Sequence, residues 1–256
     1  MHQSTAEDYE GVARIINSDG RSSVVLVCEH ASSFIPDALD NLGVAEEFRQ
    51  SHVAWDPGAL AVAERMARIL DAKLVVSGVS RLVYDCNRPP EAPDAMPARS
   101  EIVDVPGNVG LNDAARAARV ATYYEPFRTL LAQTVSQTEA PVIVTVHSFT
   151  PVYHGKTRAV EIGVLHDVDT RLADSMLAIA TGHTEAKVER NDPYGPEHGV
   201  THTLREHALP GAHLNVMLEI RNDLITASRQ QVKMAEMISG WVSNALRDLV
   251  SNGEPS

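Results

Sequence analysis

The feature that most constrains the fold is a run of five apolar residues that ends abruptly in two titratable side chains. Val24 to Cys28 is rich in Val, and Glu29 and His30 follow it directly. A run that is apolar at every position is typical of a strand buried on both faces of a mostly parallel sheet. In open α/β sheets, ligands bind at the carboxyl ends of the strands. The sequence therefore predicts a buried strand with a functional group at its end.

Two further apolar runs end in the same way. One begins at Pro141 and finishes in His147, and the other begins at Asn215 and finishes in Glu219. Because the carboxyl ends of parallel strands meet at one edge of a sheet, we expect His30, His147 and Glu219 to share a pocket.

Strand and helix patterns alternate along the rest of the chain. With 256 residues, the protein is expected to be a single α/β domain over 1–256, with a mostly parallel or mixed central sheet and helices on both faces. Asp56 followed by Pro57 is typical of a helix N-cap and first helical residue. The other elements are predicted as helices at about 59–70, 113–137, 169–180 and 226–249, strands at 73–76, 80–88, 160–165 and 185–189, and irregular loops at 89–110 and 191–199.

Composition excludes several classes of function. A net charge of −12 argues against a nucleic-acid partner, because phosphate binding needs a basic surface. No apolar run is long enough to span a bilayer, and the N-terminus lacks a secretory signal pattern, so we expect a cytoplasmic protein without a membrane partner. Only Cys28 and Cys86 occur, which fits a reducing compartment. The oligomeric state stays open.

His30 and His147 are the best metal-ligand candidates, because imidazoles at strand ends suit a catalytic Zn²⁺ site. The alternative is that both are hydrogen-bonded core histidines. The third ligand is Asp56, Glu29 or His52. Successive residues of a strand face opposite sides, which disfavours Glu29 beside His30 and favours Asp56, unless Asp56 serves only as a helix cap.

The remaining candidates are a base and a set of groups for an anionic substrate. Glu219 is predicted as a general base, with Arg221 on the same strand face as an oxyanion donor. The alternative is a structural ion pair between the two. Arginine binds carboxylates in bidentate fashion, so Arg81, Arg88 and Arg221 are candidates for that task, or else solvated surface residues. Asn87 and His207 complete the predicted substrate-binding residues.

These pieces together resemble the N-formylglutamate amidohydrolase family over about Val24 to Asp223. The resemblance implies hydrolysis of N-formyl-L-glutamate to formate and L-glutamate, late in histidine degradation. It also implies likeness to zinc carboxypeptidases and zinc amidases, with His30, Asp56 and His147 as ligands of one Zn²⁺ and Glu219 as the base for the zinc-activated water. The matching motifs are Cys28-Glu-His-Ala-Ser32, Trp55-Asp-Pro-Gly-Ala59, Ser80-Arg-Leu-Val-Tyr-Asp-Cys-Asn-Arg88, Pro106-Gly-Asn-Val-Gly-Leu111, His147-Ser-Phe-Thr150 and Glu219-Ile-Arg-Asn-Asp-Leu224.

The loop at 191–202 departs from the family pattern in its prolines and in His198 and His202. The predicted substrate is therefore N-formyl-L-glutamate or a similar small acidic N-acyl amino acid. Two alternatives stay open: a zinc amidase or peptidase acting on another acylated amino acid or a peptide, and a non-catalytic carboxylate-binding protein on the same fold.

Overall fold

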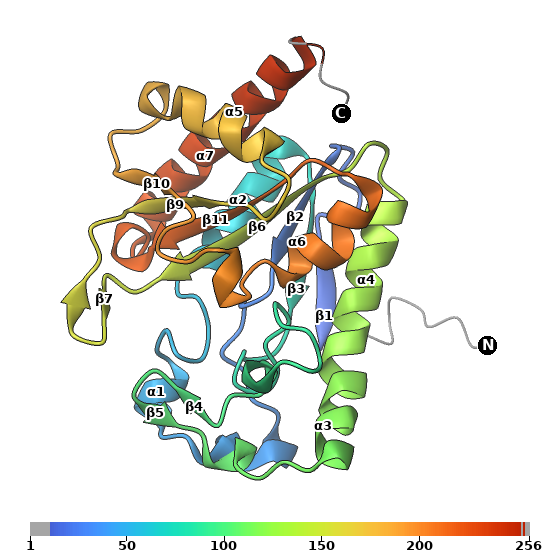
Figure 1. Cartoon of the computed structure of the whole chain (residues 1–256), viewed down its shortest axis with the longest axis vertical. Helices are drawn as coiled ribbons and strands as arrows, with labels where there is room; N and C mark the ends of the chain where they lie inside the picture. Colours follow the sequence, from blue (N-terminus) through green and yellow to red (C-terminus); the bar gives the residue numbers. More distant parts are fainter. Residues whose placement is uncertain (1–10, 252, 254–256) are drawn as a thin grey trace.

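The computed structural model describes residues 11–251 and 253, and within them a mixed seven-stranded sheet forms the centre of the protein (Figure 1). The four central strands, β3, β2, β6 and β11, run parallel to one another. β1 pairs antiparallel to β3, β9 pairs antiparallel to β11, and β10 pairs parallel to β9. Across the sheet, the strands are ordered β1 (Ala13–Ile16), β3 (Lys73–Ser77), β2 (Val24–Cys28), β6 (Val142–Phe149), β11 (Asn215–Arg221), β9 (Ile162–Leu165) and β10 (Val188–Arg190).

The three strands predicted to end in functional groups are confirmed and lie side by side. All residues of β2 and β6 are buried, which explains their uninterrupted apolar sequence. β6 extends two residues beyond His147, and β11 two residues beyond Glu219. Because β6 and β11 are parallel, His147 and Glu219 are direct neighbours in the register. The topology therefore brings the predicted site residues to one edge of the sheet.

Helices cover both faces of the sheet, as predicted. On one face α2 (Ala59–Leu70), α5 (Arg171–Ile179) and α7 (Ser228–Ser251) pack over strand residues that include Leu26 of β2. On the other face α4 (Glu125–Ser136) and α6 (His202–His207) pack over the alternate residues, including Val25 and Val27. Each strand thus supplies two hydrophobic cores at once.

The remaining elements include a group of short elements that lies below the sheet in Figure 1, a hairpin at its left edge and a helical lead into α4. The predicted helix at 113–137 consists of α3 (Asp113–Arg119), a π-helical turn (Val120–Tyr124) and α4. The other short elements are α1 (Glu46–Arg49), the hairpin of β4 (Arg99–Ser100) and β5 (Val103–Asp104), and the hairpin of β7 (Val152–Tyr153) and β8 (Lys156–Thr157). The 3-10 segments among the described residues are Asp37–Gly43, Pro93–Ala95, Pro106–Asn108, Ala180–Gly182, Pro196–His198, Leu209–Gly211 and Asn222–Leu224.

Two local predictions are wrong. The segment 80–88 is a series of turns and not a strand, and Arg81 and Asp85 form an ion pair of 2.8 Å across one of these turns. Asp56 does not cap α2, because the residue before Ala59 is Gly58, which has a φ of 86° and makes no side-chain cap. The carboxylate of Asp56 instead contacts two histidines. In both places, long-range polar contacts override the local pattern.

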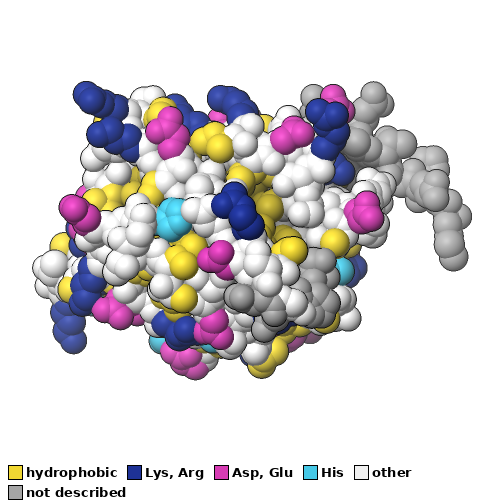
Figure 2. Space-filling model, turned by 90° about the horizontal axis from the view of Figure 1, so that it is seen from above, with side chains coloured by type: hydrophobic (Ala, Val, Ile, Leu, Met, Phe, Trp, Pro, Cys, Tyr) yellow, Lys and Arg dark blue, Asp and Glu magenta, His cyan; other side chains and the backbone are white. Residues whose placement is uncertain are grey.

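Figure 2 shows one face of the molecule, on which acidic and basic side chains are interspersed and do not gather by sign. This face therefore lacks the basic stripe that nucleic-acid binding needs. Among the described residues, no helix is both long enough and apolar enough to cross a membrane.

Candidate metal centre and active site

Three side chains converge at the carboxyl edge of the sheet. His30 follows β2, His147 lies in β6, and Asp56 lies in the loop before α2. Oδ2 of Asp56 is 3.2 Å from Nδ1 of His30 and 3.0 Å from Nδ1 of His147, and the two Nδ1 atoms are 3.3 Å apart. All three residues are buried. These are the three side chains that the sequence singled out as metal ligands, and together they form a group that could hold a metal ion.

The spacing of the three donor atoms fits a zinc ion. Ligand atoms at about 2.0–2.1 Å from a tetrahedral Zn²⁺ lie roughly 3.3 Å from one another. The distances among the three donors in the protein are 3.0–3.3 Å. Three lone-pair donors buried this close together repel one another unless a cation or protons lie among them. The donor set therefore matches the ligand number, type and spacing of a catalytic zinc site with an open fourth position.

A carboxylate lies beside the outer nitrogen of each imidazole. Nε2 of His30 lies 2.7 Å from Oδ1 of Asp85, and Nε2 of His147 lies 3.1 Å from Oε2 of Glu29. A carboxylate at Nε2 favours the proton there and leaves Nδ1 free as a metal ligand. Glu29 is thus placed as the partner of a ligand, and Asp85 has the same role at His30.

The charges of these groups are strongly coupled. Burial alone would lower the pKa of His147, but Glu29 and Asp56 raise it well above its ordinary value. The pKa of His30 is also raised, because Asp85 and Asp56 outweigh burial and the nearby Arg81. Without a cation, the cluster therefore holds protons, and a metal ion has to displace them on binding.

Glu219 is suited to proton transfer. Its carboxylate is buried and lines the same cavity as the two histidines, and no described residue hydrogen-bonds its Oε2 atom. Burial, helped by the negative charge of Asp56, raises the pKa of Glu219 to about 7. A buried carboxylate oxygen without a partner costs free energy, which indicates a functional role or a missing ligand.

The cavity beside these groups has a volume of about 280 Å³. Arg81, Arg88 and Asn87, which the sequence offered as candidates for substrate binding, line it. Arg81 is paired with Asp85 at 2.8 Å, so part of its charge is neutralised inside the protein. Arg88 is paired with the exposed Asp94 and also donates to backbone carbonyls. The amide of Asn87 is engaged with the backbone of Val200 and Thr203, which ties the cavity wall to α6.

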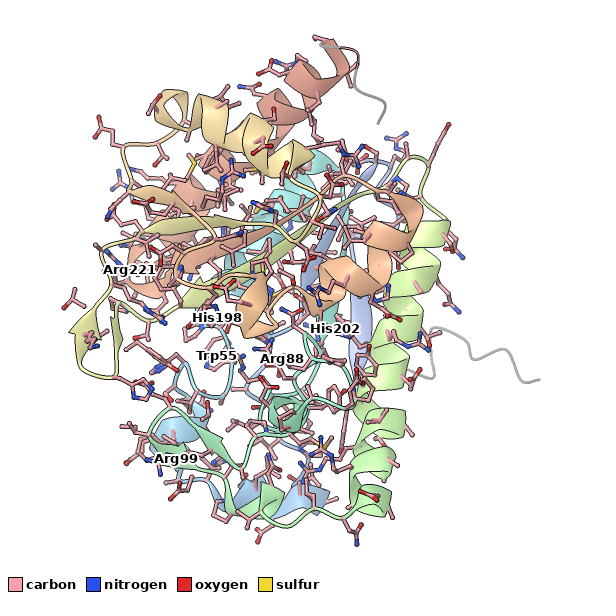
Figure 3. All side chains as sticks on the ribbon, viewed as in Figure 1. Trp55, Arg88, Arg99, His198, His202 and Arg221 are labelled. Carbon is pink, nitrogen blue, oxygen red and sulfur yellow. The ribbon has the colours of Figure 1, made fainter. Side chains whose placement is uncertain are left out.

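Three other candidates do not contact the three donors. Arg221 does not line the cavity: its guanidinium binds Glu161 and Asp223, and in Figure 3 it lies toward the left edge, away from Arg88 and His198. His207 does not line the cavity either, and burial lowers its pKa to about 4. His52 lines the cavity but bonds Glu101 at 2.6 Å and contacts none of the three donors.

Sequence reasoning missed the contributions of two loops. Asp85 lies in the segment 80–88 that was predicted as a strand, and nothing in the sequence pointed to His30 as its partner. Tyr194, in the loop that follows β10, lines the cavity beside Glu219. Glu101 lies between β4 and β5 and accepts a hydrogen bond from the backbone of His154, which lies between β7 and β8, so it joins the two hairpins. Glu101 also binds His52. The family motif that contains Asp85 was the only sequence signal for these contributions.

Comparison with known protein families assigns the chain to a family. The model of the N-formylglutamate amidohydrolase family matches residues 22–226. The chain belongs to this family. The matched range includes β2, β6 and β11, and it includes His30, Asp56, His147 and Glu219. Membership of this family supports an amidohydrolase. Among functionally curated proteins, none matches the sequence.

Two solved structures are similar to this member of the N-formylglutamate amidohydrolase family. The gene product Atu2144 from Agrobacterium tumefaciens is 51% identical, with a TM-score of 0.91 over 93% of this chain and 96% of that one. The N-formylglutamate amidohydrolase from Ralstonia eutropha JMP134 is 15% identical, with a TM-score of 0.68 over 93% of this chain and 99% of that one. At this low identity, the second likeness shows the fold alone.

Proposed function

We propose that this protein is a zinc-dependent amidohydrolase that releases formate from N-formyl-L-glutamate or a similar small N-acyl amino acid. The observation that supports this most strongly is the arrangement of Glu219. Its carboxylate, whose Oε2 atom no described residue hydrogen-bonds, lies beside three converging metal donors in a cavity of about 280 Å³. Metal-dependent hydrolysis needs a metal site with an open position and an adjacent base.

One Zn²⁺ per chain would be held by Nδ1 of His30, Nδ1 of His147 and Oδ2 of Asp56. Two imidazoles and one carboxylate favour zinc over harder ions such as Mg²⁺ or Ca²⁺. When bound, zinc supplies Lewis-acid chemistry, which lowers the pKa of water and polarises a carbonyl oxygen. Asp85 hydrogen-bonds Nε2 of His30, and Glu29 lies 3.1 Å from Nε2 of His147, so both carboxylates favour the tautomer that this chemistry needs.

Glu219 carries the proton through the reaction. It takes a proton from water as the water oxygen attacks the formyl carbon, and it later gives this proton to the leaving nitrogen as the C–N bond breaks. A pKa of about 7 suits both tasks, because the group can accept and release a proton near neutral pH. The reaction consumes the amide and one water molecule and yields formate and a free amine.

Arg88 is the main anchor proposed for a substrate carboxylate. It lines the cavity, and its partner Asp94 is exposed, so an anionic substrate can share or replace that ion pair. Arg81 adds positive charge nearer the metal donors. A cavity of about 280 Å³ suits a single amino acid derivative better than a cell-wall peptide.

The experiment is a formate-release assay on N-formyl-L-glutamate, run with and without a chelator, beside a panel of other N-formyl and N-acetyl amino acids. We expect chelator-sensitive turnover that returns on adding zinc. Chelator-sensitive turnover of a different N-acyl amino acid would keep the mechanism and replace the substrate. Carboxylate binding without any product release would refute the enzyme and favour a binding protein.

A further inference from the structure

Tyr194 lines the active-site cavity, and the proposed reaction has so far given its hydroxyl group no role. It lies in the loop between β10 and the 3-10 turn at Pro196–His198, and it lines the cavity together with His147 and Glu219. His198, which follows in the same loop, lies in the middle of Figure 3.

A glycine in β9 brings this loop against the sheet. Gly163 is paired with Glu219 in the register of β9 and β11. A Cβ atom at this position would collide with the carbonyl oxygen of Asp192 and would lie 3.2 Å from Cβ of Glu219. The loop therefore crosses the sheet directly beside Glu219, two residues before Tyr194, and only glycine leaves room for that approach.

Arg158 fixes the orientation of the Tyr194 hydroxyl. Nη2 of Arg158 lies 3.0 Å from Oη of Tyr194, and its guanidinium stands 4.8 Å from the centre of the tyrosine ring. A guanidinium has only donors, so the tyrosine oxygen must accept this bond and its own proton is free to be donated elsewhere. The same guanidinium lies over the rings of Phe149 and Tyr153, which also line the cavity.

Arg221 holds the backbone of the segment that carries Arg158. Its Nη1 atom donates to the backbone carbonyls of Arg158 and Val160, at 3.3 and 3.4 Å. The arginine predicted to act on the oxyanion thus anchors the segment that carries Arg158.

We propose that Tyr194 is a catalytic residue that donates a hydrogen bond to the scissile carbonyl oxygen as negative charge develops on it, and that Arg158 is its positioning residue. This inference rests on the proposed amide hydrolysis. As the water oxygen bonds to the carbonyl carbon, the π electron pair moves onto the carbonyl oxygen. Tyr194 stabilises that charge without losing its proton, and the pair returns when the C–N bond breaks.

The surroundings keep the tyrosine protonated. Burial and the negative charge of Glu219 raise the pKa of Tyr194 above its ordinary value, so the hydroxyl remains a donor at neutral pH. A preorganised donor in a cavity of this kind acts more strongly on the developing oxyanion than on the neutral carbonyl of the bound substrate.

The test compares Tyr194→Phe with Tyr123→Phe in the zinc-loaded enzyme. Tyr123 is also largely buried, but it lies in the π-helical turn outside the cavity, and no described residue hydrogen-bonds its hydroxyl. We expect Tyr194→Phe to lower kcat by about 10²–10³-fold, with KM changed by less than about threefold. Tyr123→Phe should keep the wild-type values, and both variants should keep their zinc and their circular dichroism.

A double-mutant cycle tests the role of Arg158. Arg158→Met should lower kcat, and the double variant with Tyr194→Phe should be no slower than Tyr194→Phe alone, because both changes remove the same interaction. Additive losses would show that Arg158 has only a structural role, and would overturn that part of the proposal.

The outcomes separate this inference from the proposed function. An active wild type with unchanged kcat in Tyr194→Phe overturns the inference alone. A raised KM with unchanged kcat also overturns it, because the hydroxyl would then bind the substrate in its ground state. A wild type without turnover on any N-acyl amino acid overturns both proposals, since the oxyanion arises only during the reaction.

Discussion

Replacing Asp85 with asparagine should weaken zinc binding, although Asp85 contacts no metal itself. Its Oδ1 atom accepts hydrogen bonds from Nε2 of His30 at 2.7 Å and from the backbone N–H of Asn87 at 2.9 Å. Its Oδ2 atom accepts one from Arg81 at 2.8 Å. Both carboxylate oxygens are therefore used as acceptors. An asparagine has one oxygen and one NH₂ group, so in either orientation a donor faces a donor.

The cost depends on which way the amide turns. If its NH₂ group faces His30, the imidazole has to accept at Nε2 and carry its proton on Nδ1, the atom that faces Asp56 and His147. This tautomer cannot bind the metal. Loss of such an outer hydrogen bond typically weakens metal affinity by about 10–100-fold, or roughly 1.4–2.7 kcal/mol.

The assay is competition for zinc against a chromophoric chelator at neutral pH. The matched control is Glu101→Gln, which changes the partner of His52 (2.6 Å) in the same cavity without touching the three donors. We expect a weaker zinc Kd in Asp85→Asn and a wild-type Kd in the control. Wild-type affinity in Asp85→Asn would refute the reasoning, because His30 would then keep its tautomer without the carboxylate.

Further predictions concern stability and the ligand set. Burial raises the pKa of Glu219 from 4.5 to about 7 in the metal-free protein, so its stabilising contribution is present below pH 4.5 and is lost as the pH rises through 7. Metal-free Glu219→Gln should therefore exceed wild type in the free energy of unfolding at pH 8 by on the order of 1–3 kcal/mol, and not at pH 4.5, in urea denaturation. Trp241→Ala in α7 should lower that free energy by about 3–5 kcal/mol, whereas the exposed Val250→Ala in the same helix should change it by less than about 0.5 kcal/mol. His147→Ala should lose both zinc, by metal analysis, and formate release.

The sequence predicted well wherever one physical signal dominated. The strands β2, β6 and β11 are apolar at nearly every position because helices cover them on both faces, so their runs could be read directly. The same runs end near polar residues at one edge of a parallel sheet, which predicted that His30, His147 and Glu219 lie together. The position of these residues followed from topology and required no knowledge of the loops.

Prediction failed where distant segments decide the local structure. The segment 80–88 has a strand-like pattern, yet contacts of Arg81 and Asp85 with His30 and Asp56 hold it as turns. Arg221 shares a strand with Glu219, but its partners Glu161 and Asp223 draw it away from the cavity.

Tyr194 was missed for a related reason. Its place in the cavity depends on Gly163 in β9, a residue 31 positions earlier in the chain that admits the loop. No spacing rule joins a loop tyrosine to a strand glycine, so this part of the site could be found only in three dimensions.

The most direct test of the proposed centre is zinc content measured beside formate release in wild type and Glu219→Gln. Glu219 is not one of the three donors, so the variant should hold about one zinc per chain, like the wild type. Its turnover should fall by at least about 10²-fold, because the base that moves the proton is gone. Wild-type turnover in Glu219→Gln, or full activity of zinc-free wild type, would contradict the account.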